Sequence, residues 1–143
     1  MTYDYQEIAS EQQLFAFIKK NFIQDLNPTK FTNSRYDCYS SKYNLDIELK
    51  CRRKHYDELI IERKKYDSLM ERSTTYGTIP VYINSTPKGV WGFYLQQYEV
   101  EWSRRDLPKQ TDFSDRQTIS KEVGYLKVSE GVDLILLLSS SFP

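Results

Sequence analysis

Apolar residues recur every three or four positions near the start of the chain, which is the period of a helix with one buried face. In the segment 11–22 they are Leu14, Phe15, Ile18 and Phe22. Ser10 followed by Gln13 forms a capping-box pattern ahead of this segment, and Asp4 with Glu7 offers an earlier cap. The sequence therefore predicts a helix that begins near residue 5 or residue 11 and ends before the Asn-Pro pair at 27–28.

A strict alternation of apolar and polar residues follows in the segment 43–52, which is the period of a half-buried strand. One face carries Leu45, Ile47, Leu49 and Cys51, and the other carries Asp46, Glu48, Lys50 and Arg52. An extended run at 34–39 precedes this strand across the polar turn SSKYN, so the two runs predict a hairpin. If its turn centres on Lys42 and Tyr43, Asp37 lies opposite Glu48. The same register keeps Cys38 and Cys51 too far apart for a disulfide.

The rest of the chain mixes helix and strand signals. Residues 62–75 carry a helical apolar stripe that stops at Gly77, and IPVYIN and VWGFYLQ flank the turn STPKG as a hairpin. Residues 98–117 predict a long surface loop and 119–128 a short strand. Residues 132–138 fit either a strand or a helix, with burial inside the chain favoured over a dimer contact. We expect one α/β or α+β domain spanning residues 1–143.

The composition excludes several classes of function. Twenty basic residues balance twenty acidic ones, so a histone-like polyanion binder is disfavoured, although a local basic patch is allowed. A single histidine without any CxxC pair excludes zinc fingers, and the lack of GxGxxG excludes a Rossmann nucleotide site. The longest apolar run, 134–138, is too short to cross a bilayer, and the acidic N-terminal sequence differs from a signal peptide. We expect a cytoplasmic chain without a membrane partner.

Asp37, Glu48 and Lys50 form the candidate site. Residues two apart on a strand share a face, so Lys50 lies beside Glu48, and Asp37 faces Glu48 from the neighbouring strand. Two facing carboxylates repel each other unless a cation lies between them, and Mg²⁺, or Mn²⁺ in its place, suits all-oxygen ligands. Lys50 would then orient or deprotonate the attacking water, or stabilise charge on a phosphate. The basic residues that follow would contact nucleic-acid phosphates: Arg52, Arg53, Lys54 and Lys65.

Two simpler interpretations stand beside this one. An alternating strand with charges on one face is typical of any half-exposed antiparallel strand, so Glu48 and Lys50 could form a solvated surface pair. His55 follows the basic run in a predicted loop, where a solvent-exposed, inert side chain is favoured over a catalytic base.

The segments YDCYSSKYNLDIELKCRRK, LIIERKKYDSLMER and IPVYIN together resemble the PD-(D/E)XK nuclease superfamily, in particular its small phage or mobile-element members. The resemblance spans residues 5–95 and implies a restriction-endonuclease-like core, a central mixed sheet flanked by helices. It also implies that Asp37 and Glu48 bind Mg²⁺ and that Lys50 is catalytic. Glu7 would match an additional acidic residue of the first helix, and Lys65 with Tyr66 would flank the site.

Two features depart from that family pattern. Tyr36, rather than proline, precedes Asp37, and Asp46 is a competing carboxylate on the Glu48 face. The metal-binding pair could therefore be Asp46 and Glu48, which would leave Asp37 with a structural role.

The function expected from these residues is a metal-dependent nucleic-acid phosphodiesterase, a DNA endonuclease of the hydrolase class. A homodimer with two-fold symmetry would suit the cutting of two strands. The alternative is a catalytically inactive nuclease-fold module that binds nucleic acid or serves as a phage accessory or assembly protein. The zero net charge favours this alternative, since many DNA binders are basic overall.

Overall fold

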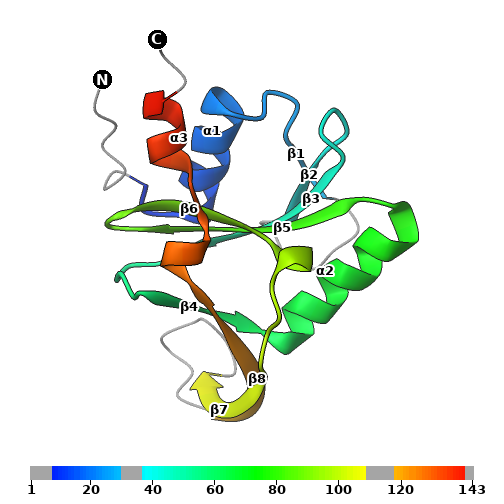
Figure 1. The fold of residues 1–143 in the computed structure, drawn as a ribbon, viewed down its shortest axis with the longest axis vertical. Helices are drawn as coiled ribbons and strands as arrows, with labels where there is room; N and C mark the ends of the chain where they lie inside the picture. Colours follow the sequence, from blue (N-terminus) through cyan, green and yellow to red (C-terminus); the bar gives the residue numbers. More distant parts are fainter. Residues whose placement is uncertain (1–7, 30–36, 109–117, 141–143) are drawn as a thin grey trace.

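Two β-sheets and three α-helices form the part of the chain described by the structure, a computed structural model: residues 8–29, 37–108 and 118–140. In chain order the elements are α1 (Glu11–Asn21), β1 (Asn27–Pro28), β2 (Asp37–Ser40), β3 (Leu45–Cys51), β4 (Glu58–Glu62), α2 (Arg63–Tyr76), β5 (Ile79–Thr86), β6 (Gly89–Tyr94), the 3₁₀ turn η2 (Leu95–Gln97), β7 (Ser103–Pro108), β8 (Thr118–Lys127), the 3₁₀ turn η3 (Val128–Glu130), β9 (Val132–Asp133) and α3 (Leu134–Ser140). The larger sheet has the order β1-β2-β3-β5-β6-β9, and the smaller has the order β4-β8-β7 (Figure 1).

The larger sheet is mixed. β3 and β5 run parallel, with Leu45 beside Ile79 and Cys51 beside Ser85, whereas its other strand pairs are antiparallel. The chain passes from β3 to β5 through β4 and α2, because parallel neighbours need a crossover connection. This crossover places α2 against β3 and β5 of the larger sheet and against β4 and β8 of the smaller one.

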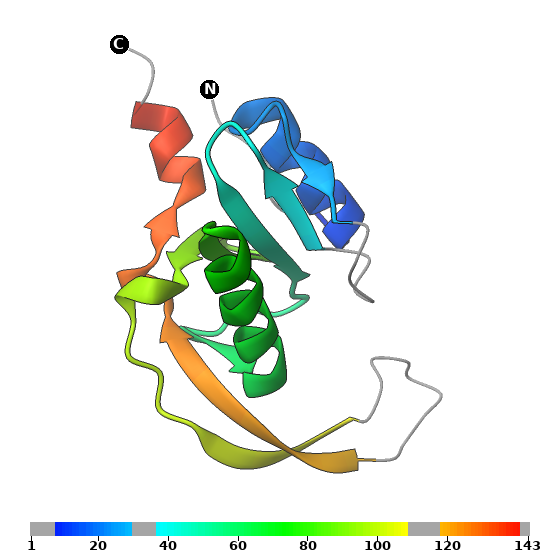
Figure 2. The same cartoon turned by 90° about the vertical axis from the view of Figure 1, so that its right-hand side faces the viewer.

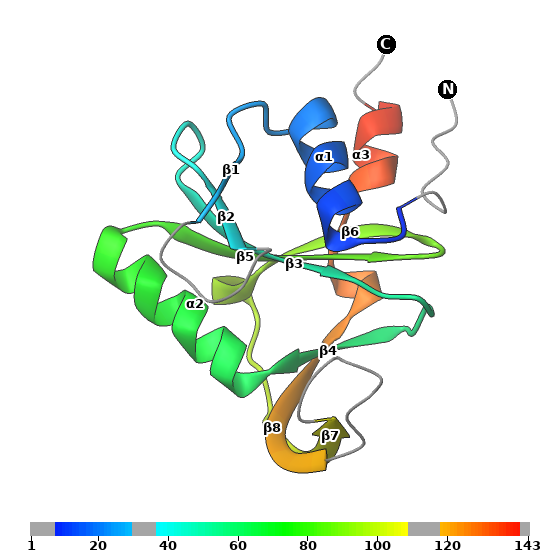
Figure 3. The same ribbon diagram turned by 180° about the vertical axis from the view of Figure 1, so that it is seen from behind.

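Both faces of the larger sheet bury apolar side chains. On one face, Leu14 and Ile18 of α1 share a cluster with Ile47 and Leu49 of β3, and the first residues of α3 pack against it. On the other face, a second cluster includes Leu69 of α2 with side chains of β4, β6 and β8. Figures 1 and 3 show α1 and α3 on one side of the sheet and α2 with β4 and β8 on the other. The polar face of β3 therefore lies inside the molecule.

The helix ends follow the local sequence signals. α1 begins at Glu11, and the Ser10 hydroxyl caps it by accepting a hydrogen bond of 3.1 Å from the Gln13 amide. The alternative start near residue 5 is wrong, because residues 8–10 are not helical. α2 ends at Gly77, whose left-handed φ of 67° suits glycine. None of the described helices combines the length and the hydropathy that crossing a bilayer requires.

Two predictions about the C-terminal third were wrong in part. The supposed loop 98–117 contains β7, whose charged sequence SRRDLP suits the exposed edge of the smaller sheet. The segment 132–138 divides into β9 and α3, and only part of its apolar surface is buried. Leu136 and Leu137 remain 65% and 48% exposed, because one side of α3 faces away from the sheet.

Candidate active site

Three carboxylates lie on the face of β2 and β3 that α2 covers. The predicted register is confirmed, since Asp37 lies opposite Glu48 and Tyr39 lies opposite Asp46. The side chains of Asp37 and Asp46 are each 8% exposed, and the Glu48 side chain is 14% exposed. The surface-strand interpretation is therefore wrong for this part of β3. The reason is the crossover, which places α2 against β3 (Figure 2).

α2 places two positively charged side chains next to these carboxylates. Lys65 and Arg72 are seven residues apart, or about two helical turns, so both face β3. Lys65 Nζ lies 3.6 Å from Glu48 Oε1. Arg72 is shared between two carboxylates, with its Nε 3.2 Å from Asp46 Oδ1 and its Nη1 3.7 Å from Asp37 Oδ2.

Asp46 and Asp37 differ in how their oxygens are used. Asp46 accepts hydrogen bonds at both oxygens, from Arg72 Nε and from the Thr78 hydroxyl. Asp37 Oδ1, in contrast, is buried without a hydrogen-bond partner among the described residues. A buried acceptor without a partner is unfavourable unless a ligand satisfies it. Asp37 is therefore better placed than Asp46 to bind a cation together with Glu48.

Lys50 is the next residue on the polar face of β3, close to the end of the strand at Cys51. Burial lowers the pKa of the Lys50 ammonium, and the nearby Arg52 guanidinium lowers it further, while Glu11 acts in the opposite direction. The electrostatic influence of Glu11, the first residue of α1, on Lys50 is one that the sequence interpretation missed. That interpretation named Glu7, which lies outside the described residues. The position of Glu11 directly after the Ser10 cap was the available signal.

No protein-family model matches this chain, and no curated protein matches it in sequence. Among solved structures, its fold is similar to that of Hjc, a Holliday junction resolvase from the archaeal hyperthermophile Archaeoglobus fulgidus. The TM-score is 0.57 at 14% sequence identity, over 90% of this chain and 92% of that one. The chain has a resolvase-like fold. The predicted fold class, a restriction-endonuclease-like core with a central mixed sheet flanked by helices, is confirmed.

Arg52, for which the sequence suggested a phosphate contact, has its guanidinium bound to groups inside the protein. Its Nε donates to Asn84 Oδ1 at 2.8 Å, and its Nη2 donates to the Tyr82 hydroxyl at 3.0 Å and to the Ile60 carbonyl. These contacts join β3, β5 and β4, so Arg52 links the two sheets from inside the resolvase-like fold. Arg53 and Lys54, which follow it, are exposed.

His55 is largely buried, contrary to the prediction of a solvent-exposed side chain. Only 12% of the side chain is exposed, and its ring centroid lies 5.2 Å from that of Trp91. His55 Nδ1 lies 2.9 Å from the Thr86 hydroxyl, and Nε2 lies 3.4 Å from Asp57. The side chain thus packs against the hairpin of β5 and β6, away from the three carboxylates.

Both cysteines are free, as the register predicted. Cys38 is buried, and burial raises the pKa of its thiol to about 12, with the Asp37 charge adding to the effect. A thiol held in its protonated form is a poor nucleophile, so Cys38 serves as a core residue.

The pair of carboxylates suits a magnesium ion better than it suits a metal held entirely by protein side chains. Among residues 8–29, 37–108 and 118–140, no group of three or more His, Cys, Asp or Glu side chains forms a metal cluster. Mg²⁺ is commonly held by one or two carboxylates together with waters and substrate phosphates. Asp37, with its unpartnered Oδ1, and the facing Glu48 supply that donor set.

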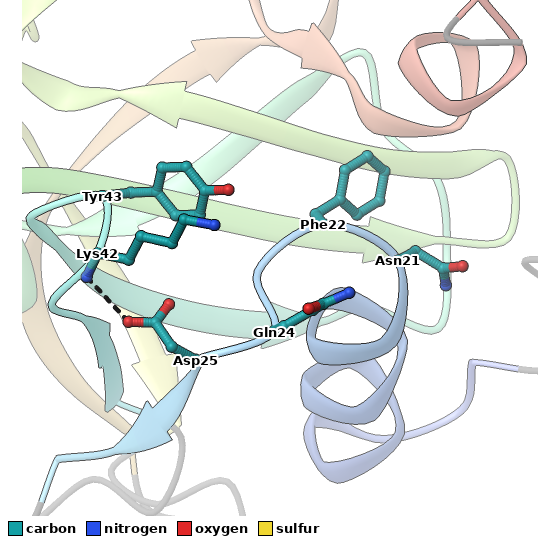
Figure 4. A pocket seen from close by; sticks show the side chains of 6 residues that line it. All are labelled: Asn21, Phe22, Gln24, Asp25, Lys42 and Tyr43. Atoms are coloured by element: carbon teal, nitrogen blue, oxygen red, sulfur yellow. Dashed lines mark hydrogen bonds between the residues drawn. The ribbon is translucent and has the colours of Figure 1, made fainter.

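A pocket of about 430 Å³ lies elsewhere, between the end of α1 and the β2–β3 turn. Figure 4 shows Lys42 and Tyr43 of the turn across from Phe22 and Asn21. Its Asp25 accepts hydrogen bonds from the Ser40 hydroxyl at 2.6 Å and from the Lys42 amide at 2.9 Å. Because none of the three buried carboxylates lines this pocket, we assign it no part in the site.

Proposed function

We propose that this protein is a divalent-cation-dependent nucleic-acid phosphodiesterase that acts as a DNA endonuclease. The observation that carries the proposal is the meeting of Asp37 and Glu48 across two paired strands, with Lys50 two residues further along the same face. The burial of the carboxylates beneath α2 supports the proposal. Burying charged groups is energetically costly, so a cluster of buried carboxylates favours a functional role over a purely structural one. The likeness of the fold to Hjc, which is named as a Holliday junction resolvase, supports the choice of DNA.

Asp37 and Glu48 would hold Mg²⁺ or Mn²⁺. When bound, such an ion lowers the pKa of water and offsets the charge that develops on the phosphate. Lys50 would donate hydrogen bonds from Nζ to the phosphate oxygens or hold the attacking water in line. Its lowered pKa, which follows from burial, makes the ammonium easier to deprotonate than an exposed lysine. The negative charge of Glu11 raises the pKa of Lys50 and so favours its protonated, positively charged form.

Exposed basic residues near this site would contact the nucleic-acid backbone. Arg53 and Lys54 follow β3 directly and are exposed, and the Lys65 side chain is 46% exposed at the start of α2. Arginine and lysine bind phosphates without reading sequence, so these side chains would position the strand over the carboxylates. Arg52 is left out of this set because its guanidinium is bound inside the protein.

Cleavage by a Lys50→Met variant tests the proposal. Duplex DNA, a four-way junction, single-stranded DNA and RNA would be incubated with Mg²⁺ or Mn²⁺. We expect the variant to cut at least about 100-fold more slowly than the native chain, in line with the loss of one charge-stabilising group. Lys64→Met, an exposed lysine of α2, is the matched control and should cut normally. Equal cutting by Lys50→Met and the native chain would contradict the proposal.

A second candidate function is a catalytically inactive module that binds nucleic acid. The pairing of the carboxylates with Lys65 and Arg72 favours it, because these contacts neutralise charge that would otherwise attract a metal. Titration with Mn²⁺ distinguishes the two. An enzyme should bind Mn²⁺ in a manner lost in Glu48→Gln, whereas an inactive module should bind DNA but no metal at this position.

A homodimer would suit an enzyme that cuts two strands. The exposed Leu136 and Leu137 of α3 offer an apolar surface for it. Sedimentation equilibrium of the native chain and of Leu136→Glu would show whether α3 mediates association.

A further inference from the structure

The two cations that α2 presents to the carboxylates are held in different ways. The Arg72 side chain is 15% exposed and is fixed by contacts with two carboxylates. The Lys65 side chain is 46% exposed, and its one ionic contact with the residues that the structure describes is with Glu48, at 3.6 Å. That separation is longer than a charge-assisted hydrogen bond, which lies near 2.7–2.9 Å. Arg72 is thus a fixed partner, whereas Lys65 is loosely held.

Glu48 nevertheless needs a positive charge close by. Its side chain is only 14% exposed, and a buried carboxylate without a counterion is strongly unfavourable. In the described part of the chain, Lys65 is the residue whose ion pair with Glu48 the structure shows. A divalent cation that binds Glu48 would supply the same charge more strongly, and the two positive groups would repel each other.

Lys65 can leave this position at small energetic cost once a divalent cation neutralises Glu48 in its place. Its ammonium is a compact charge on a flexible four-carbon chain, and ion pairs of half-exposed lysines contribute little to stability. Because Lys65 lies in the first turn of α2 and is open to solvent, its side chain can turn outward without any change in the backbone.

We propose that Lys65 is an exchangeable counterion of Glu48. It neutralises Glu48 in the free protein and leaves when a divalent cation binds, and its ammonium then contacts a phosphate of the nucleic acid. The inference rests on the proposed function, since it concerns the same carboxylate pair. It adds that metal binding and phosphate binding are coupled through one side chain.

Binding of Mn²⁺ without nucleic acid provides the first measurement, by isothermal titration calorimetry. Removing a competing positive charge should tighten Mn²⁺ binding by Lys65→Met about three- to tenfold, as expected for a partly solvent-screened pair. Lys65→Arg keeps the charge and should bind as the native chain does. Lys64→Met removes an equal charge about 100° around the helix and should also leave Mn²⁺ affinity unchanged.

DNA binding provides the second measurement, and the same substitution should act in the opposite direction. In the presence of Ca²⁺, we expect Lys65→Met to bind duplex DNA about three- to tenfold more weakly. The slope of log affinity against log salt should fall by about one, as for the loss of one phosphate contact. A residue with only a structural role would not improve one binding constant while weakening the other.

The outcomes separate this inference from the proposed function. If Glu48→Gln abolishes Mn²⁺ binding while Lys65→Met and Lys64→Met both bind as the native chain does, the counterion role is overturned and the metal site stands. Weaker Mn²⁺ binding by Lys65→Met also overturns it. If the native chain binds no Mn²⁺, the proposed function fails, and this inference fails with it. Chemical denaturation of each variant shows that the fold is intact.

Discussion

Arg72 is the residue on which the buried acidic face of β3 most depends for stability. It contacts Asp46 at 3.2 Å and Asp37 at 3.7 Å, and both carboxylate side chains are only 8% exposed. Replacement by methionine keeps most of the aliphatic volume but removes the charge. The substitution therefore leaves two buried carboxylates without their cation while avoiding a large cavity.

The structure sets the expected size of the effect. Removing one partner of a buried ion pair destabilises a protein by about 3–5 kcal/mol, because the remaining charge is left uncompensated. Asp46 keeps its hydrogen bond from the Thr78 hydroxyl, so we expect a value near the lower limit, about 3 kcal/mol. For a domain of this length, the unfolding entropy of about 2.1 cal/mol/K per residue converts this loss into a fall in Tm of roughly 10 °C.

Denaturation by guanidinium chloride would measure the change in unfolding free energy. Arg63→Met is the matched control on the same helix, because Arg63 pairs with Glu122 at 2.6 Å but the two side chains are 46% and 35% exposed. That half-exposed pair should contribute far less to stability than the buried contacts of Arg72, because solvent screens it. Adding Asp46→Asn to Arg72→Met should recover about 1 kcal/mol or more, since it removes one of the uncompensated charges.

Two results would refute this reasoning. Equal losses of stability for Arg72→Met and Arg63→Met would mean that burial of the carboxylates does not depend on Arg72. A double variant no more stable than Arg72→Met alone would mean that the loss arises from packing rather than from charge.

Two further predictions concern other parts of the fold. Gly124→Ala should lower the free energy of unfolding by about 1–3 kcal/mol in chemical denaturation, because the alanine Cβ would lie 2.1 Å from Val100 Cγ1. Adding Val100→Ala to the same chain should restore much of the lost stability. A double variant as unstable as Gly124→Ala would mean that the clash with Val100 is not the cause. Hydrogen bonds, first from the Ser40 hydroxyl and then from the Lys42 amide, lower the pKa of the Asp25 carboxyl in the folded state, so its stabilising effect is present above the unfolded pKa and is lost as pH falls through the folded value. Asp25→Asn should therefore melt below the native chain at pH 7, with the gap closing in acid; a gap that does not change with pH would contradict this account.

Local signals in the sequence were enough to predict α1, α2, the β5–β6 hairpin and the pairing of β2 with β3. The alternation of β3 and the short polar turn determine which residues oppose each other, because a strand repeats every two residues and a hairpin turn sets its register. The Ser10 cap and the Gly77 stop likewise act within a few residues of the helix ends. Asp37 and Glu48 could therefore be paired without knowledge of the tertiary structure.

Tertiary structure decided which of these polar residues are buried and what they contact. Arg72 is twenty-six residues from Asp46, and Arg52 meets Asn84 across thirty-two residues, so no local pattern could show that one arginine holds the carboxylates while the other links the two sheets. The charge of Glu11 raises the pKa of Lys50 because α1 packs against β3, so this influence also arises from the tertiary structure. The sequence by itself determined the alternation and the register, since these depend on backbone geometry. The role of each charge depended on the crossover that places α2 over β3, because burial and ionic contacts arise between segments far apart in the chain.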